Sequence, residues 1–310
     1  MQGLVIRNTG SWYEVRTDGG RVLQCKIKGN FRLRGIRSTN PVAVGDIVDL
    51  IENNDGTAFI CEIADRRNYI IRRASNLSKQ SHILAANIDL VLLFFTINYP
   101  ETSSIFIDRF LASAEAYRIP VVILFNKTDL LDDGEMERME TFRRLYTSIG
   151  YTCYAVSVVK REGLEELSGL LKDKITLVAG NSGVGKSALL NALVPTANAA
   201  TASISDSHNV GMHTTTFSEM YDLPGGGSII DIPGVKGFGT FDFEPQEVSH
   251  YFREIFNESQ NCKYSNCMHL EEPHCAVRQA IAEGRIAASR YQAYLSMLGD
   301  KDEDKYRPAY

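Results

Sequence analysis

The sequence has no long hydrophobic segment. Its longest apolar run, Leu90 to Ile97 with one threonine, is far shorter than the roughly 20 residues that span a bilayer. The N-terminus also lacks a secretory pattern, because it turns polar at Arg7 before an apolar stretch has formed. A run of this length instead fits a strand buried on both faces of a parallel sheet. We therefore expect a cytoplasmic protein with no membrane partner.

Cysteine is scarce too. Three of the six cysteines, Cys262, Cys267 and Cys275, lie close together near the C-terminus. In a chain without an export signal, such a cluster favours metal binding over disulfides. With His269 it offers three thiolates and one imidazole, the ligand set of a closed tetrahedral site for one structural Zn²⁺. His274 is the competing imidazole, but it adjoins Cys275 and would need a very tight turn, so His269 is preferred.

No internal repeats are visible, and positive charge is concentrated near one end of the chain. Residues 1–75 contain twelve Lys or Arg against eight Asp or Glu, although the whole chain has a formal net charge of -5. A basic module on an acidic body suggests a polyanion partner for the N-terminal part. A solvated charged surface would give the same pattern, so charge alone does not decide between the two.

The N-terminal region is typical of a small β domain. Segments rich in β-branched and aromatic residues are separated by turn signals such as Asp18-Gly19-Gly20. About five strands in some 70 residues predict a closed barrel such as an OB-fold, with an SH3-like barrel as the alternative. The expected strands are Gly3–Ile6, Trp12–Thr17, Arg21–Lys28, Asp46–Ile51 and Thr57–Ile63.

From Ile88 to about Gly239 strands and helices alternate, as in a doubly wound α/β domain. The polar residues 73–85 are expected to link it to the barrel, and the chain beyond Phe241 is expected to be helical. The sequence thus predicts three domains, at residues 1–72, 73–240 and 241–310. The expected strands are Ile88–Phe95, Pro120–Asn126, Thr152–Ser157, Thr176–Ala179 and Gly227–Asp231, and the expected helices are Ser104–Tyr117, Glu135–Ile149, Leu164–Leu171, Lys186–Val194, Pro245–Asn257 and Ala276–Leu298.

A phosphate-binding loop is predicted directly after the strand Thr176–Ala179. The segment matches G-x-x-x-x-G-K-[ST], and it lies between an apolar strand and a helix, which is the context that supports the motif. We expect Lys186 to reach the β- and γ-phosphates and Ser187 to ligate Mg²⁺. The expected nucleotide contacts here are Gly180, Asn181, Ser182, Gly183, Val184, Gly185, Lys186, Ser187 and the adjoining Ala188.

A guanine-recognition loop is predicted at the end of the strand Val121–Phe125. Asp129 can accept hydrogen bonds from guanine N1–H and the 2-amino group together. Adenine lacks this donor pair, so ATP would leave the carboxylate unpaired at a cost of roughly 1–3 kcal/mol. Asn126 is expected to support the loop and the base, Lys127 to pack along the base, and Ser157 to lie in a second base-contacting loop. The motif itself is Asn126, Lys127, Thr128 and Asp129.

Two further elements complete a nucleotide switch. Asp231 to Gly234 matches D-x-x-G, in which the aspartate supports Mg²⁺ through water and the glycine amide senses the γ-phosphate. The aperiodic segment Pro195–Phe217 before it has the composition of a long switch loop. Thr215 in that segment is expected to ligate Mg²⁺, with Thr214 and Thr216 as alternatives.

The residue after Gly234 is Val235, where many GTPases carry a glutamine that orients the attacking water. Valine cannot do this, so intrinsic hydrolysis should be slow and should need another residue or a partner. His213 is a candidate helper, and a merely solvated loop histidine is the ordinary alternative.

The order of the motifs is the most restrictive feature. The guanine loop precedes the phosphate loop, whereas an ordinary GTPase has the phosphate loop first, so the G domain is predicted to be circularly permuted. Asp231–Gly234 then leads almost directly into the cysteine cluster. As a hypothesis, movement of the switch would therefore act on the C-terminal domain.

The barrel, the order NKTD, GNSGVGKS, HTTT and DIPG, and the trailing cysteine cluster together resemble the bacterial RsgA/YjeQ family of circularly permuted GTPases that depend on the small ribosomal subunit. The resemblance covers essentially the whole chain. It implies an OB-fold, a permuted G domain and a zinc-binding domain. It also implies GTP hydrolysis to GDP stimulated by that subunit, a late role in its maturation, binding to its rRNA, and a monomer off the ribosome. The arginine-rich barrel edge, Arg66, Arg67, Arg72 and Arg73, fits contact with rRNA.

Other functions are weighed against this one. A nucleotide-gated RNA-binding assembly factor with incidental hydrolysis is compatible with Val235. A permuted GTPase of large-subunit assembly is disfavoured by the barrel and the zinc cluster. A metabolic P-loop kinase is disfavoured because the NKTD motif would then have no role.

Overall fold

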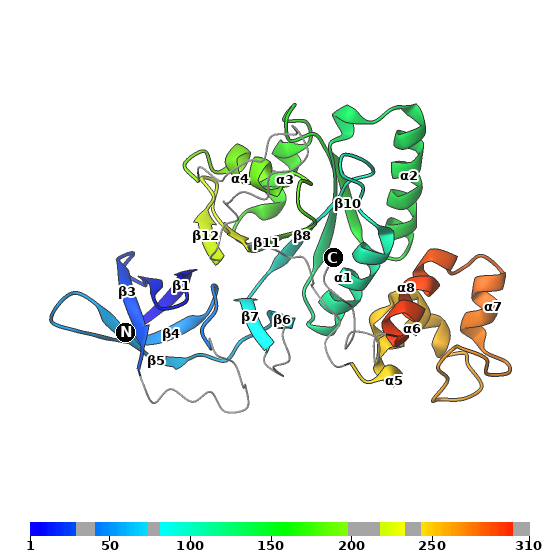
Figure 1. Cartoon of the computed structure of the whole chain (residues 1–310), viewed down its shortest axis with the longest axis horizontal. Coiled ribbons are helices and arrows are strands. Elements are labelled where there is room, and N and C mark those ends of the chain that lie inside the picture. Colours follow the sequence, from blue (N-terminus) through cyan, green and yellow to red (C-terminus); the bar gives the residue numbers. More distant parts are fainter. Residues whose placement is uncertain (29–40, 74–80, 198–217, 233–242, 300–310) are drawn as a thin grey trace, which may run out of the picture.

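The computed structural model describes residues 1–28, 41–73, 81–197, 218–232 and 243–299, and the structural statements below concern these ranges. They form an N-terminal barrel, a central sheet flanked by helices, and a C-terminal helical module that packs beside the central part (Figure 1). The predicted multidomain fold class is therefore confirmed.

The barrel is a closed five-stranded sheet. Its order is β1-β2-β3-β5-β4, closed by pairing of β4 with β1, and all neighbours are antiparallel except β3 and β5. Alternate side chains such as Val5, Val15 and Ile60 are fully buried in its core, because successive residues of a strand point to opposite faces. This order is that of the OB-fold. The strands are β1 Gln2–Asn8, β2 Tyr13–Thr17, β3 Val22–Ile27, β4 Ile47–Glu52 and β5 Ala58–Ile63.

A hairpin connects the barrel to the central sheet. Strand β6 (Tyr69–Arg73), at the end of the region predicted to be the barrel, pairs with β7 (Ser81–Ala86). β7 lies mostly within residues 73–85, where the sequence predicted a polar linker. Ile70 of β6 and Ala85 of β7 belong to the same core cluster as the central sheet. These tertiary contacts stabilise the hairpin, and the local sequence pattern did not indicate them.

The central sheet has the order β10-β9-β8-β11-β13-β12, and its neighbours are parallel except for β12 with β13. Helices α1 and α2 cover one face, and α3 and α4 cover the other. The strands are β8 Leu90–Phe95, β9 Val121–Asn126, β10 Thr152–Val156, β11 Ile175–Ala179, β12 Ser218–Asp222 and β13 Ser228–Asp231, and the helices are α1 Ser104–Ala116, α2 Asp133–Ser148, α3 Leu164–Leu171 and α4 Lys186–Leu193.

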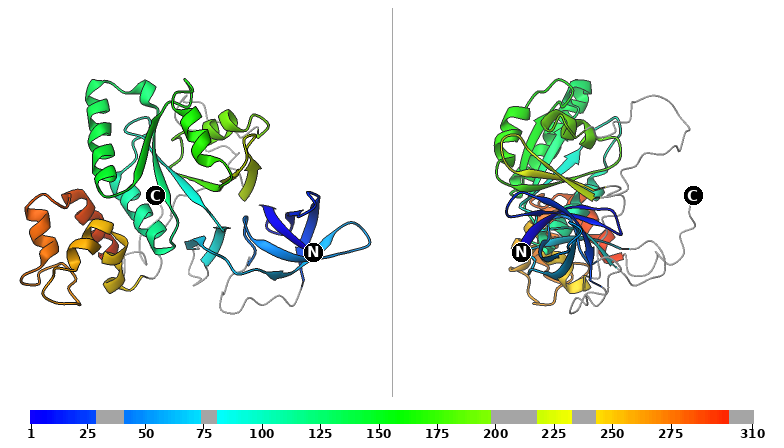
Figure 2. Two further views of the ribbon diagram at one scale, coloured as in Figure 1. Left: turned by 180° about the vertical axis from the view of Figure 1, so that it is seen from behind. Right: turned by 90° about the vertical axis from the view of Figure 1, so that its left-hand side faces the viewer.

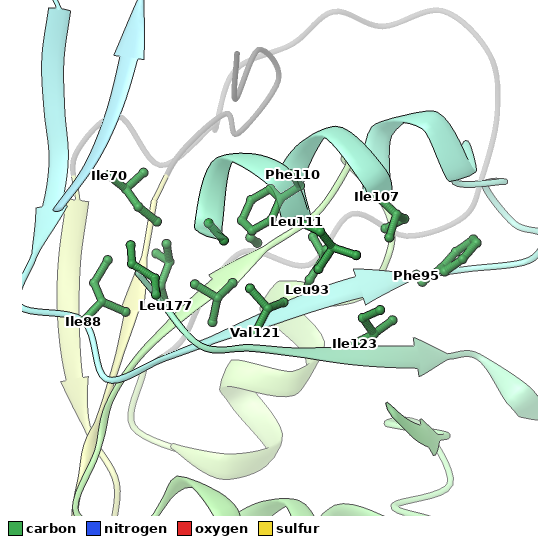
Figure 3. Packing of buried hydrophobic residues seen from close by; sticks show 14 of the residues in the cluster. Ile70, Ile88, Leu93, Phe95, Ile107, Phe110, Leu111, Val121, Ile123 and Leu177 are labelled. Atoms are coloured by element: carbon green, nitrogen blue, oxygen red, sulfur yellow. The ribbon is translucent and has the colours of Figure 1, made fainter. Parts of the chain in front are cut away.

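Strand β8 shows why the apolar run is continuous. Leu93 and Phe95 point toward α1 and α2 and pack with Ile107 and Phe110 (Figure 3), whereas Phe94 faces the opposite core under α3 and α4. Both faces of the strand are covered, so every position is apolar. This confirms the buried parallel strand predicted from the sequence.

Strand β12 was not predicted, and it joins the two sheets. It pairs with β13 on one side and with β1 of the barrel on the other, which makes one continuous sheet of eleven strands. The sequence Ser-Glu-Met-Tyr-Asp carries little apolar signal because only Met220 in it is fully buried against the core.

The C-terminal module is built from short helices around a small core. The two long helices predicted there are both divided, the first at residues 249–252 and the second by the turn around Gly284. Phe252 and Tyr294 lie at its centre, and Ala112 of α1 belongs to the same cluster. The elements are α5 Pro245–Val248, the 3-10 turn η2 Ser249–Tyr251, α6 Arg253–Ser259, α7 Ala276–Ala282 and α8 Ala288–Leu298.

A buried arginine fastens this module to the central domain. Arg290 of α8 is 0% exposed and donates to Glu254 at 2.6 Å and to Asp108 of α1 at 3.0 Å. Asp108 also accepts a 2.8 Å hydrogen bond from the Tyr146 hydroxyl on α2. A single buried charge would be costly, but here the charges are paired. The ion pairs of Arg290 with Glu254 and Asp108 connect α8 and α6 of the C-terminal module to α1 of the central domain.

Candidate nucleotide and metal sites

The predicted nucleotide motifs meet at one edge of the central sheet. The phosphate loop follows β11, the NKTD loop follows β9, and Ser157 follows β10. The chain runs outward from β8 to β10 and then returns to β11 on the other side of β8, which makes a topological switch point. Ligands of open α/β sheets bind at such a point, beyond the carboxyl ends of the strands.

The phosphate loop is held in shape by its lysine. The Lys186 ammonium donates to the carbonyl oxygens of Gly180 at 2.8 Å and Asn181 at 2.6 Å. Burial lowers the pKa of Lys186, and the nearby Asp231 carboxylate opposes that shift. Lys186, Ser187 and Ala188 form the first turn of α4, so backbone N–H groups are directed toward the loop.

Asn126 connects the base-recognition loop to the phosphate loop. Its side-chain amide donates to the Val184 carbonyl at 2.8 Å and accepts from the Val158 amide at 3.3 Å. The side chain comes so close that a Cβ at Gly185 would lie 2.3 Å from its Nδ2 atom, and Gly185 also has a φ of +106°. Both facts require glycine at this position of the motif.

Asp129 and Ser157 form the second half of the base site. The Ser157 hydroxyl donates to Asp129 at 2.6 Å and accepts from the Lys160 amide at 3.1 Å. One carboxylate oxygen of Asp129 is thereby oriented, and Thr128 beside it lies in the 3-10 turn η1 (Thr128–Leu130) that shapes the loop. An oriented carboxylate next to an open loop is what a guanine edge requires.

The loop between β8 and α1 is a part of this site that the motifs did not reveal. Lys127, at a φ of 68°, directs its ammonium to the backbone carbonyl of Tyr99. The ring of Pro100 packs against Gly183, where a Cβ would lie 3.3 Å from the proline Cδ. Both contacts use backbone or ring atoms, so no side-chain signature in the sequence could have indicated them.

Asp231 lies at the end of β13, beside the phosphate loop. Burial raises the pKa of Asp231, the Lys186 charge opposes that shift, and the Glu219 charge on β12 adds to it. In the pairing of β13 with β11, Asp231 lies opposite Val178, two residues before the phosphate loop begins at Gly180. Gly234, His213 and Thr215, which the sequence places in the switch, lie outside the described residues.

The second cluster holds the four predicted metal ligands. The Cys275 sulfur lies 3.5 Å from His269 Nδ1, the Cys262 sulfur lies 3.7 Å from it, and the two sulfurs are 3.9 Å apart. All four donor atoms, Cys267 included, lie within 4.8 Å of one another. A tetrahedral zinc site with Zn–S bonds of about 2.3 Å has ligand separations of about 3.8 Å, so the donor set fits Zn²⁺.

Helix α8 supports the loop that carries the histidine. The Tyr291 hydroxyl donates to the His269 carbonyl at 2.6 Å, and the Tyr294 hydroxyl donates to the Met268 carbonyl at 2.7 Å. His269 itself is 1% exposed, whereas His274 is at the surface and outside the cluster. Such outer contacts fix the orientation of metal ligands.

The expected RNA-binding arginines differ in their surroundings. Arg66 is almost fully buried and donates twice to Asp46, at 2.6 Å each, so it stabilises the barrel and is not part of an exposed edge. Arg67 is largely exposed and pairs with Asp89 at 2.8 Å. No membrane-crossing helix, judged by length and apolarity, occurs in the part of the chain that the structure describes.

A phosphate loop and a base-recognition loop joined on a doubly wound sheet, with the base loop first in the chain, define a circularly permuted P-loop GTPase. Two family models match the sequence, RsgA GTPase over residues 63–241 and RsgA N-terminal domain over residues 2–60. The chain belongs to the RsgA GTPase family and is a GTPase, which takes GTP with Mg²⁺ and releases GDP.

Relatives and solved structures agree over the full length. A "Small ribosomal subunit biogenesis GTPase RsgA" of Bacteroides fragilis is 64% identical over 310 residues, and that of Porphyromonas gingivalis is 55% identical over 315, each covering 100% of both chains. YjeQ from Thermotoga maritima matches with a TM-score of 0.76 at 32% identity over 96% of each chain. YloQ, titled a circularly permuted GTPase, matches at 0.73 and 30% identity, over 100% of this chain and 96% of that one.

Proposed function

We propose that this GTPase binds the small ribosomal subunit and acts in its late maturation, hydrolysing GTP to GDP with stimulation by the subunit. The observation that carries the proposal is the joined site in which Asn126 of the base loop contacts Val184 of the phosphate loop. The names of the full-length relatives, small ribosomal subunit biogenesis GTPases, supply the partner. The conserved length and the barrel at the N-terminus support the same assignment.

We propose the following roles for the residues of the site. Asp129, oriented by Ser157, reads the guanine edge, while Lys127 packs along the base. Lys186 exchanges its bonds to Gly180 and Asn181 for the β- and γ-phosphates when nucleotide enters. Ser187 and Thr215 would hold Mg²⁺, with Asp231 in support, and the ion would neutralise phosphate charge. The Gly234 amide and His213 complete the proposed catalytic set.

In the proposed chemistry, the main contribution is the positioning of the phosphates, and a general base contributes less. A P-loop site binds the three phosphates with backbone N–H groups and one lysine, and charge that develops during phosphoryl transfer is stabilised in place. Val235 provides no hydrogen bond to an attacking water. The partner therefore has to complete the site or reposition the switch, which is why we propose subunit-stimulated hydrolysis.

The remaining modules have supporting roles in this proposal. The barrel of residues 1–72 contacts rRNA, residues 73–240 form the permuted GTPase domain, and residues 241–310 form the zinc-binding domain. Zn²⁺ held by Cys262, Cys267, His269 and Cys275 stabilises a module whose hydrophobic core is small. The protein is proposed to be a cytoplasmic monomer when it is off the ribosome.

Sedimentation with separated subunits tests the partner. The chain is incubated with purified small or large subunits and with GDP, or with a GTP analogue that cannot be hydrolysed. We expect it to pellet with small subunits, and more strongly with the GTP analogue than with GDP. Pelleting with large subunits instead would support the alternative of large-subunit assembly and contradict this proposal.

A nucleotide-gated RNA-binding factor is the second candidate, and Val235 is the observation that favours it. It predicts the same sedimentation but slow turnover that the subunit does not change. Steady-state hydrolysis with and without small subunits separates the two functions.

A further inference from the structure

Strand β1 belongs to two domains at once. Its side chain Val5 lies in the barrel core, whereas Leu4 and Ile6 on its other face pack against the core of the central sheet. The end of the same strand pairs with β12, with Arg7 opposite Glu219 and Asn8 opposite Ser218. Figures 1 and 2 show the two strands side by side from different directions. The barrel is therefore joined to the central domain by a shared sheet.

Two ion pairs cross this junction. Arg7 of β1 lies 3.8 Å from Glu219 of β12 and 3.6 Å from Glu14 of β2. Arg16 of β2 contacts Asp222 at the other end of β12. These side chains are partly exposed, so water screens their attraction and the pairs can rearrange at little cost. Both ends of β12 are thus held by charges that belong to the barrel.

The opposite side of β12 reaches the nucleotide site. Glu219 is the neighbour of Asp231 in the pairing of β12 with β13. Burial raises the pKa of Asp231, the Lys186 charge opposes that shift, and the Glu219 charge adds to it. In the sequence, β12 begins one residue after Phe217, and so directly continues the segment that contains Thr214 to Thr216.

The attachment of the C-terminal module is of a different kind. Its central contact is Arg290, which is 0% exposed and paired with both Asp108 and Glu254. A fully buried pair cannot exchange partners with water without a large cost. The junction between the barrel and the central domain at β12 is therefore easier to rearrange than the junction with the C-terminal module. The hypothesis that the switch acts on the C-terminal domain would require the more rigid of these two junctions to move.

We propose that β12 is the element through which an RNA bound to the barrel controls GTP hydrolysis. A displacement of β1 shifts the pairing of Arg7 with Glu219, and β12 carries the change to Asp231, the partner of Glu219 on β13. This inference rests on the proposed function and names the regulation of the same site. It predicts that substitutions at residues that contact neither RNA nor nucleotide can reduce the stimulation of hydrolysis while subunit binding is kept.

Charge reversal at the junction tests the coupling in the full-length chain. The variants are Arg7→Glu, Glu219→Arg and the double variant that restores the pair with exchanged signs. Each is assayed for thermal unfolding, for sedimentation with small subunits, and for GTP turnover without and with saturating subunits. The matched control is the same exchange at Arg21 and Glu52, an ion pair at 3.0 Å that lies within the barrel.

We expect each single variant to bind subunits and to lose about tenfold in stimulation, within the range of allosteric couplings, while the double variant recovers most of it. The control pair should keep full stimulation. Single variants that are folded and stimulated as strongly as the unaltered chain would overturn the inference, and so would loss of subunit binding in parallel with loss of stimulation. An unaltered chain that subunits bind but do not stimulate would reject the proposed function together with this coupling.

Discussion

The side-chain amide of Asn126 donates a 2.8 Å hydrogen bond to the carbonyl oxygen of Val184. One residue belongs to the base-recognition loop and the other to the phosphate loop, so this bond assembles a single nucleotide site from motifs in reversed order. The same side chain accepts from the Val158 amide at 3.3 Å and thus reaches the third loop as well. Asn126 was predicted to support the loop and the base, and in the structure its side chain connects three loops of the site.

Replacing Asn126 with alanine should therefore weaken nucleotide binding. The change removes two hydrogen bonds of a residue that is 4% exposed and leaves the Val184 carbonyl unpaired, at a cost of about 1–3 kcal/mol. The affinity for GDP should fall by about 10–100-fold. Titration of a fluorescent GDP analogue measures it. Glu137→Ala, at an exposed position of α2 away from the motifs, is the control, and equal affinities for both variants would contradict the role of Asn126.

Asp129→Asn should change which base is bound. The amide nitrogen can donate to the 2-oxo group of xanthine, where the carboxylate accepted from the guanine amino group. Competition between GDP and xanthosine diphosphate should shift by about 100-fold or more toward xanthine. Ser157→Ala removes the 2.6 Å hydrogen bond that orients Asp129. It should lower the affinity for both nucleotides and leave GDP the preferred one. An unchanged preference in Asp129→Asn would remove the proposed base contact.

Lys186→Ala should abolish measurable hydrolysis. The ammonium is the cation that the site aims at the phosphates, and loss of one such charge costs about 10²–10³-fold in turnover. Burial lowers the pKa of Lys186, and the Asp231 charge opposes that shift. Single-turnover release of phosphate is the measurement. Retained activity would show that Lys186 does not contact the transferred group.

The proposed metal site gives His269 and the nearby His274 different roles. His269→Ala removes a buried side chain that is proposed to bind zinc, and the metal content should fall from about one zinc per chain to less than half of that. His274→Ala changes an exposed imidazole outside the cluster, and its zinc content should stay near one. Elemental analysis of the two purified variants decides the matter. Equal zinc in both would mean that His269 is not a ligand.

Arg290→Met should destabilise the C-terminal module strongly. Removing the guanidinium leaves Asp108 and Glu254 buried without their cation, which costs about 3–5 kcal/mol. Arg285→Met, at a half-exposed arginine paired with Glu258, should cost no more than about 1 kcal/mol. Urea denaturation of the two variants gives the comparison, and similar losses would contradict the importance of the buried pair.

The same variant should respond to pH in a defined direction. Burial already raises the pKa of Asp108, and the Arg290 charge now opposes that shift, so the pKa rises further in Arg290→Met. A carboxyl with a raised folded pKa adds stability below its unfolded pKa of about 3.9 and loses it as pH rises through the folded value. The stability deficit of Arg290→Met relative to the unaltered chain should therefore shrink as the pH is lowered. A deficit that is constant with pH would contradict the stated role of Asp108.

Much of this architecture could be predicted because local patterns are strong where both faces of a strand are buried. Strands β8, β9 and β11 are continuous apolar runs, and the phosphate loop lies between such a strand and a helix. The five barrel strands follow from alternation and turn residues. The reversed order of the motifs specified a permuted domain, and the likeness to YloQ agrees with it.

What could not be predicted depends on contacts between distant segments. Strand β12 has one fully buried residue, and pairing with β1 and β13 stabilises it. Arg66 and Arg290 have the composition of surface residues and become structural because Asp46 and Asp108 meet them in the fold. The carbonyl of Tyr99 contacts Lys127 through an atom that every residue has. Sequence patterns report local periodicity and side-chain chemistry. The pairing of β12, the buried arginine pairs and the contact with the Tyr99 carbonyl leave no trace in either of these.

The central claim is that a slow GTPase is switched on by the small ribosomal subunit. The most direct measurement is the rate of GTP hydrolysis by the full-length chain, alone and with purified small subunits, with large subunits as the control. We predict slow turnover alone and with large subunits, and an increase of at least about tenfold with small subunits, which is modest beside the roughly 10³–10⁵-fold that a complete partner-supplied catalytic group can add. Turnover that is fast alone, or equally slow with small subunits present, would contradict the account.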